Sequence, residues 1–163
     1  MNICNIRLFI DIFINNNTIY FFILHFSLKN IIFIYYNMNI IQKRFLLFLI
    51  GCIGTRTLFV YLAKIANRTY LRYMGYLAIL PAIGFFYLFL SGSRKTGAEV
   101  FGDKIWWNNL RPIHGLLYLL FAYNAINGNQ FAWIYLLVDV IIGLVSFLSF
   151  HYYKNNFRHL YIL

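Results

Sequence analysis

Two residues of opposite charge, each inside an apolar run, carry the clearest chemical signal in this sequence. Arg56 falls at the middle of the run 45–66, and Asp139 falls near the middle of the run 131–152. A charged side chain in the hydrocarbon core of a membrane is costly unless it is paired or hydrated. Because each residue is the other's obvious partner, the sequence predicts an intramembrane ion pair between Arg56 and Asp139.

Two interpretations of this predicted pair remain open. The pair could belong to a proton or ion pathway, which His114 on a neighbouring apolar run could extend. It could instead be a structural lock, because a buried ion pair can fix which helices meet even where its net stabilisation is small. A pathway would ordinarily show several titratable groups in series, so the lock is the leading interpretation.

The loop 94–114 holds the densest group of polar and aromatic side chains. Its candidates for a lipid-headgroup, interfacial or catalytic site are Glu99, Asp103, Lys104, Trp106, Trp107, Arg111 and His114. A carboxylate could bind a metal or act as a base, while Arg111 would hold a phosphate and His114 would carry a proton. The alternative is simple anchoring, since paired tryptophans beside basic residues are typical of the membrane–water interface.

Motifs for catalysis or metal binding do not emerge from the sequence. No HExxH pair, nucleophile–base motif or phosphate-cradling glycine pattern occurs. No second His, Cys or carboxylate lies at metal-ligand spacing from His114 on its own run. The sequence therefore favours a non-enzymatic protein and assigns no catalytic residue, no metal and no cofactor. The basic C-terminal residues His151, Lys154, Arg158 and His159 are interpreted as an interfacial tail.

The elements that would position these residues are membrane helices. Hydrophobic residues make up 62% of the chain and charged residues 11%, against about 25% charged residues in a soluble domain. A span needs about 20 mostly apolar residues, and the candidate spans are 45–66, 73–90, 112–127 and 131–152. The sequence predicts an all-α integral membrane protein, a four-helix bundle.

The second predicted helix contains Pro81, which removes a backbone hydrogen bond and should kink the helix. Small residues on either side of this proline would let neighbouring helices approach closely. These residues are Gly75, Ala78, Ala82 and Gly84.

The orientation follows from the basic residues, which flank the apolar runs. With four spans, the N-terminus, the central loop and the C-terminus share one side, and that side carries most of the Lys and Arg residues, so both termini are predicted to be cytoplasmic. The first loop carries Lys64, Arg68 and Arg72, and these basic residues on the opposite side argue against this orientation.

The basic residues that give the net charge of +10 do not form the basic stripe that nucleic acid requires. The expected partners are the lipid bilayer and either a second copy or other membrane proteins.

Residues 1–37 differ in composition from the rest of the chain. They contain no Gly, Ala, Val, Pro, Trp, Glu or Gln and are built mainly from Ile, Asn, Phe and Tyr, whose codons are rich in A and T. We expect the native protein to begin at Met38, so that 1–37 is an extension and 38–163 is the four-span domain. One alternative is an extra apolar helix at 18–36, against which the polar His25 and Lys29 argue. The other is a secretory signal peptide, against which the lack of a small-residue cleavage site after the apolar stretch argues.

A resemblance accompanies these patterns in the segment 97–126. The residues that carry it are Trp106-Trp107-Asn108, then Leu110-Arg111-Pro112-Ile113-His114, then Leu117-Tyr118. The segment resembles a stretch of small, uncharacterised membrane proteins encoded by large DNA viruses of eukaryotes. The resemblance implies a multi-helix membrane protein and brings no activity and no functional residue.

Three functions follow as expectations. The leading one is a structural or scaffolding component of a viral or internal membrane. The second is a small proton or ion channel or transporter that uses Arg56 and Asp139. The third is a lipid-headgroup-binding protein or lipid-acting enzyme that uses the loop 94–114.

Overall fold

The structure is a computed structural model that describes residues 37–97, 100 and 103–160. The chain divides into two units, Met1–Asn39 and Ile40–Leu163, and everything below concerns the second unit. The predicted extension 1–37 and the alternative helix at 18–36 lie outside the described residues, apart from Asn37.

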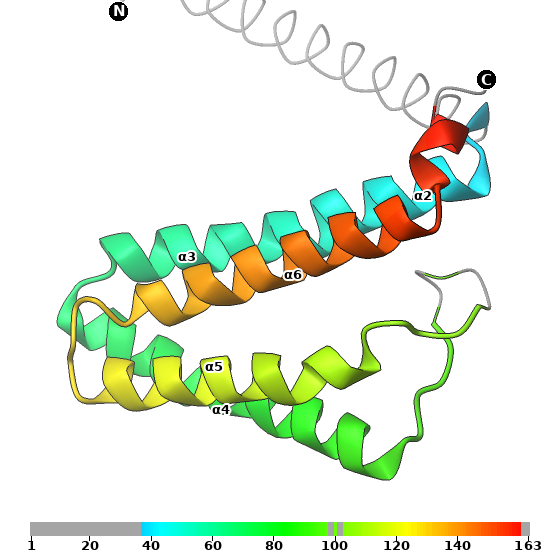
Figure 1. The fold of residues 1–163 in the computed structure, drawn as a ribbon. Coiled ribbons are helices and arrows are strands. Elements are labelled where there is room, and N and C mark those ends of the chain that lie inside the picture. Colours follow the sequence, from blue (N-terminus) through cyan, green and yellow to red (C-terminus); the bar gives the residue numbers. More distant parts are fainter. Residues whose placement is uncertain (1–36, 98–99, 101–102, 161–163) are drawn as a thin grey trace, which may run out of the picture. The chain divides into compact units, whose positions relative to one another are not determined.

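The described residues form helices and no named strand (Figure 1). A continuous first helix is built from an α-helical, a π-helical and a second α-helical segment, and short 3-10 helices precede α5 and follow α6. The elements are α2 (Ile40–Leu46), η1 (Leu47–Gly54), α3 (Thr55–Ile65), α4 (Arg68–Ser91), η3 (Asn108–Leu110), α5 (Arg111–Ile126), α6 (Trp133–Tyr153) and η4 (Asn156–Leu160).

Among the described residues, three helices are long and apolar enough to cross a membrane. They are Ile40–Ile65, Arg68–Ser91 and Trp133–Tyr153. The remaining long helix, α5, has 16 residues, about 24 Å at 1.5 Å per residue, and a bilayer core is about 30 Å thick. The third predicted span therefore lies on a helix shorter than its three neighbours.

The ends of the helices follow from local chemistry. The Asn67 side chain accepts a hydrogen bond from the backbone N–H of Tyr70 at 3.0 Å and so caps the start of α4. Gly92 ends that helix with φ 58°, a left-handed conformation that glycine adopts at little cost. Pro112 lies in the first turn of α5, where its missing N–H is not needed. Gly128, with φ 77°, allows the turn toward α6.

Helices α4 and α5 pack closely, and α6 packs on both α5 and α3 (Figure 1). A Cβ atom added at Gly75 would lie 3.0 Å from the Ala125 Cβ, and one added at Gly115 would lie 2.9 Å from Cε2 of Phe86. The two backbones can approach this closely because these residues have no side chain. Gly84 differs from the expectation, since a Cβ there would meet nothing within 4 Å.

An apolar core lies between the helices, toward the end where α3 connects to α4 and α5 connects to α6. Its members are small or aliphatic residues gathered around one buried phenylalanine, so the helices can pack without large gaps. They are Val60, Ala63, Leu71, Ala78, Phe121, Ala122, Ala125, Ala132, Leu136 and Val140.

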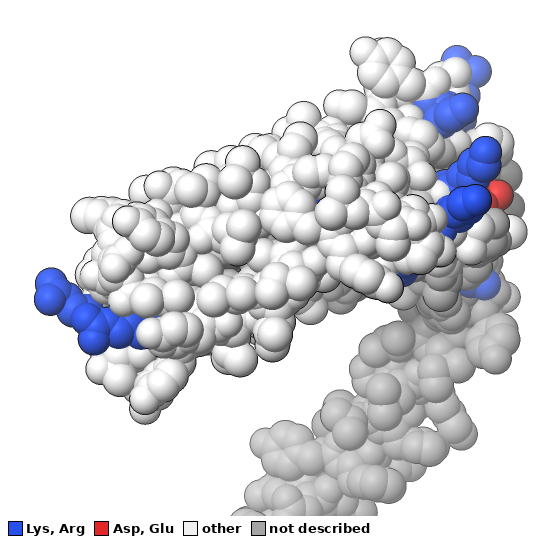
Figure 2. All heavy atoms as spheres, turned by 90° about the horizontal axis from the view of Figure 1, so that it is seen from below, with Lys and Arg blue, Asp and Glu red and all other residues white. Residues whose placement is uncertain are grey.

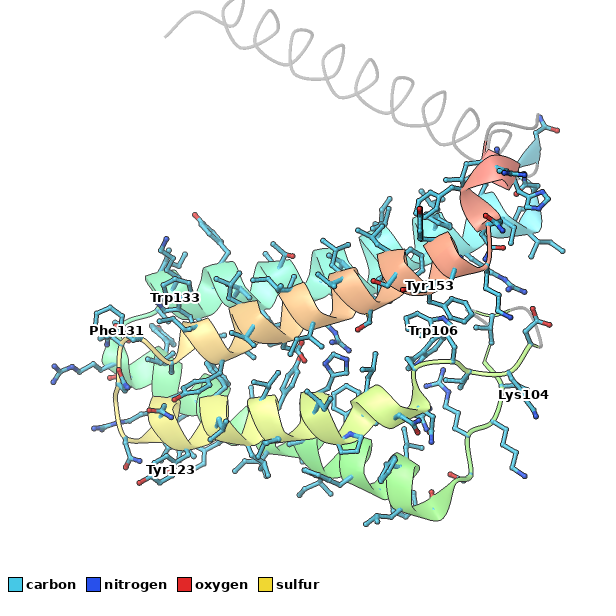
Figure 3. The ribbon with its side chains drawn as sticks, viewed as in Figure 1. Lys104, Trp106, Tyr123, Phe131, Trp133 and Tyr153 are labelled. Atoms are coloured by element: carbon cyan, nitrogen blue, oxygen red, sulfur yellow. The ribbon has the colours of Figure 1, made fainter. Side chains whose placement is uncertain are left out.

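The outer surface is apolar between two polar ends. On the face shown in Figure 2, Lys and Arg gather at the two ends of the helices, with uncharged side chains between them. Aromatic residues also lie at both ends, with Trp106 and Tyr153 at one and Tyr123, Phe131 and Trp133 at the other (Figure 3). Large apolar side chains are exposed along the helices. A surface of this kind suits lipid, with aromatic side chains at the interfaces.

Candidate functional site

Asp139 is the centre of a buried charge cluster. Its side chain on α6 is 1% exposed. Its Oδ2 accepts a hydrogen bond from Nη1 of Arg56 on α3 at 2.9 Å, and its Oδ1 lies 2.5 Å from Nδ1 of His114 on α5. With an ionised carboxylate, Nδ1 of the imidazole carries the hydrogen and donates it to Oδ1. One carboxylate thus joins three helices.

Arg56 lies at the edge of this cluster and is 17% exposed at its side chain. Its Nη1 is also 3.3 Å from the His114 Nδ1, and its guanidinium carbon lies 5.7 Å from the centre of the Phe85 ring. In the described part of the chain, the hydrogen bonds of Arg56 all involve Nη1. Its Nη2 and Nε therefore keep their donor capacity for another acceptor.

Helix geometry brings the cluster together. Gly143 lies one turn beyond Asp139 on the same buried face of α6. A Cβ at Gly143 would lie 3.7 Å from the Arg56 Nη1 and 3.8 Å from the His114 Cε1. The glycine therefore leaves the space into which the guanidinium and the imidazole reach.

A cavity of about 480 Å³ adjoins the cluster. Arg56, His114 and Gly143 line it on the side of the cluster, and Arg94, Trp106 and Trp107 line it on the side of the loop. Asp139 is not among the described lining residues, so its carboxylate lies behind the cavity wall. The cavity connects the loop end of the helices with the guanidinium in their interior.

Arg111, one of the loop candidates, lies in the interior. It is 2% exposed, and its Nη1 donates to Oδ1 of Asn108 at 2.7 Å and to the carbonyl oxygen of Leu88 at 3.3 Å. Its guanidinium therefore joins the start of α5 to the end of α4. A basic residue beside two tryptophans resembles an interfacial anchor in the sequence, and only the packing shows that it turns inward.

Four other loop candidates line one small cavity of about 90 Å³, and they are Asp103, Lys104, Trp106 and Trp107. Asp103 forms an ion pair with Nη2 of Arg44 at 2.5 Å, and its side chain is 67% exposed. Lys104 is exposed. Trp106 stacks on Phe150 at the C-terminal end of α6, with ring centres 4.6 Å apart. Glu99 lies outside the described residues.

His151 contradicts its interpretation as part of an interfacial tail. It is 2% exposed and packs against Phe147 and Phe45, with ring centres 4.3 Å and 4.6 Å away. The side-chain amide of Asn156 lies 2.7 Å from its Nδ1. The sequence held a signal for this burial, because His151 continues the four-residue spacing of Asp139, Gly143 and Phe147 along α6.

No protein-family model matches the chain, and the comparisons with curated proteins and with solved structures found no match. The class of the protein is therefore defined by its fold and by the charge cluster around Asp139. The residues that the structure describes are all-helical, three of their helices are long and apolar enough to cross a membrane, and a buried charge cluster lies between the helices.

Proposed function

We propose that this chain is a multi-pass membrane protein with a structural or scaffolding role in a viral or internal membrane. In this proposal all four long helices cross the bilayer, α4 is bent at Pro81, and both termini lie in the cytoplasm. The observation that carries the structural role is the Asp139 carboxylate, whose two oxygens are engaged by residues of two other helices.

The proposal that α5 crosses the membrane rests on its neighbours. It packs between α4 and α6, so its termini lie near the ends of helices that are long enough to span a bilayer. The 3-10 turn Asn108–Leu110 lengthens it at its start. Its buried polar groups, Arg111 and His114, face other helices. A short helix surrounded in this way can cross by thinning the bilayer locally.

The proposed orientation rests on the distribution of positive charge. The end of the helices with the start of α2, the central loop and the end of α6 holds more basic residues than the end with the α3–α4 connection. Such an excess favours the cytoplasmic side. The resemblance of 97–126 to viral membrane proteins supports a viral or internal membrane as the location.

The burial of Asp139 favours a lock over proton conduction. A conducting carboxylate must exchange protons with water along a path, whereas this carboxylate is 1% exposed and lies behind the cavity wall. Pairing of both its oxygens instead determines how α3, α5 and α6 meet. Buried polar contacts that specify partners in this way are the best-attested use of such pairs.

A proton or ion transporter is the second candidate, and the cavity is the observation that favours it. The cavity brings Arg56 and His114 within reach of molecules entering from the loop end. A transporter open to one side would have such a cavity leading to charged groups in the middle of the membrane.

The substitution Asp139→Asn distinguishes these two functions. Under the lock, Arg56 loses its charged partner, and we expect the unfolding free energy in detergent to fall by about 3 kcal/mol. The same change at the exposed Asp103 is the matched control and should leave stability nearly unchanged. Proteoliposomes containing the intact protein should show no proton flux above that of empty liposomes. Flux that disappears in Asp139→Asn without loss of stability would contradict the lock and favour the transporter.

A further inference from the structure

We infer that the cavity beside Arg56 binds an uncharged molecule that carries a hydroxyl group on an apolar body. This inference goes beyond the structural role, because a lock needs no ligand. It rests on an acceptor and donors that face the cavity, on the charge balance of the cluster behind them, on the apolar wall, and on the π-helical segment along one side.

The imidazole of His114 presents a hydrogen-bond acceptor to the cavity. Its Nδ1 lies 2.5 Å from Oδ1 of Asp139 and carries the hydrogen, so Nε2 of the neutral ring is an acceptor. Among the described residues, Nε of Arg44 is the one buried side-chain nitrogen or oxygen without a hydrogen-bond partner. Nε2 of His114 also has no partner there, so it is not buried. Since His114 lines the cavity, this acceptor is open to it.

The guanidinium of Arg56 presents donors beside this acceptor. In the described part of the chain its hydrogen bonds involve Nη1, and Nε and Nη2 are not buried, for the reason given for Nε2 of His114. Nη1 lies 3.3 Å from Nδ1 of His114, so the two side chains are neighbours on the wall. A hydroxyl group donates one hydrogen and accepts at its lone pairs. It can therefore bind both side chains at once.

The charges of the cluster favour an uncharged ligand. The guanidinium of Arg56 is always charged, and the Asp139 carboxylate balances it at 2.9 Å. A carboxylate ligand at Nε2 of His114 would meet a lone pair instead of a donor, and an ammonium ligand would lie beside a like charge. A hydroxyl group avoids both conflicts.

The remaining wall selects an apolar body. Phe48, Phe85 and the two adjacent tryptophans line the cavity. Its volume of about 480 Å³ falls within the range of about 300–1,000 Å³ that is typical of ligand pockets. Such pockets combine an apolar lining with a few polar groups that fix the orientation of the ligand. Here Arg56 and His114 are those polar groups.

One side of the cavity is formed by the π-helical segment η1. Four residues of this segment line the cavity, and they are Leu47, Phe48, Gly51 and Cys52. The hydroxyl group of Thr55 donates to the carbonyl oxygen of Gly51 at 2.5 Å and lies 3.1 Å from that of Cys52. π-Helical turns are rare and frequently lie at functional sites. The unusual stretch of the first helix thus coincides with the cavity, as a binding site would require.

Tryptophan fluorescence can test the inference with the full chain. The sequence has three tryptophans, and Trp133→Phe leaves Trp106 and Trp107, which both line the cavity, as the reporters. The protein in phosphatidylcholine nanodiscs is titrated with brominated decanol and with para-bromophenol, each beside its methyl ether. The ether keeps the oxygen acceptor and the apolar body but cannot donate to Nε2 of His114.

Bromine quenches tryptophan on contact, so the titrations report binding in the cavity. We expect saturable quenching by a hydroxyl compound, with a dissociation constant about tenfold below that of its methyl ether, because the ether leaves Nε2 of His114 without a hydrogen bond. Saturation separates binding at a site from partition into the lipid.

One pair of variants in this background locates the site. Gly51→Phe should abolish saturable quenching by filling the cavity. Gly84→Phe is its matched control and should leave the quenching unchanged. A Cβ at either glycine meets nothing within 4 Å, and Gly84 does not line the cavity.

A second pair tests the role of His114. In His114→Asn the side-chain amide can still donate to Asp139 in place of Nδ1, but the acceptor Nε2 is lost. We expect this variant to bind the alcohol and its ether equally. His159→Asn, at an exposed histidine outside the cavity, should keep the tenfold preference for the alcohol.

The two hydroxyl compounds identify the source of the ligand. Saturable quenching by brominated decanol alone supports an alcohol from the bilayer, and saturable quenching by para-bromophenol supports a ligand from water. The inference is overturned if neither compound quenches saturably or if each ether binds as tightly as its parent. Equal effects of the two glycine variants, or an unchanged preference in His114→Asn, would also overturn it.

The comparison of each alcohol with its ether needs no change in the cavity, so it decides the inference even where a variant fails to fold. The structural role is tested separately, because the unfolding free energy of Asp139→Asn is measured without a ligand.

Discussion

At the scale of single residues, His114 and Arg56 share the stabilisation of one carboxylate. The His114 Nδ1 lies 2.5 Å from Oδ1 of Asp139, and the imidazole side chain is 6% exposed. A hydrogen bond to a buried charge contributes more than a neutral one, and the unpaired acceptor that remains after its loss is costly. His114 should therefore matter to stability although it bears no known activity.

The substitution His114→Leu tests this contribution. We expect it to lower the unfolding free energy by about 1.5–3 kcal/mol, because Oδ1 of Asp139 loses its donor. His159→Leu, at an exposed histidine, should change it by about 0.5 kcal/mol or less. Denaturant unfolding in detergent measures both values. Equal stability of the two variants would show that His114 does not support the carboxylate.

Part of this cluster could be predicted from the sequence. Arg56 and Asp139 could be paired because they carry opposite charges at similar depth in two apolar runs, and in the structure the Arg56 Nη1 lies 2.9 Å from the Asp139 Oδ2. The position of His114 depends on how α5 is rotated against α6, and the sequence gives no measure of that rotation. The inward direction of Arg111 was unpredictable for the same reason.

At the scale of helices, close contact between α4 and α5 depends on residues without side chains. We expect Gly75→Ala to destabilise the protein by about 1–3 kcal/mol, because the new methyl group would force the helices apart. It would lie 3.0 Å from the Ala125 Cβ. Gly84→Ala is the matched control and should be neutral or slightly stabilising, since alanine favours a helix more than glycine. Thermal unfolding distinguishes the two, and equal values would contradict tight α4–α5 packing.

The helices themselves could be predicted, but their pairing could not. Hydrophobic runs mark where the long helices occur because a span needs a minimum length of apolar residues. The same pattern placed Gly75 and Gly84 alike beside Pro81, although only Gly75 lies in a tight contact. Which face of a nearly uniformly apolar helix meets another helix depends on side-chain shape, and hydrophobicity does not encode it.

At the scale of the whole molecule, the central claim is that all four long helices cross a bilayer. The structural lock depends on it, because hydrocarbon outside the helices makes a buried charge costly. Exposed apolar side chains along the helices and aromatic residues at both ends support the claim. Of the four helices, the short α5 is the one for which crossing the bilayer is hardest to achieve.

Cysteine labelling tests this claim most directly. In a variant without Cys4 and Cys52, single cysteines replace Lys95, Asn129 and Lys154 in turn, and an impermeant maleimide is applied to cells in which only the plasma membrane has been opened. We predict that Lys95→Cys and Lys154→Cys react at once, whereas Asn129→Cys reacts only after the internal membranes are opened as well. Reaction of Asn129→Cys and Lys95→Cys from the same side would show that α5 does not cross the membrane and would contradict the account.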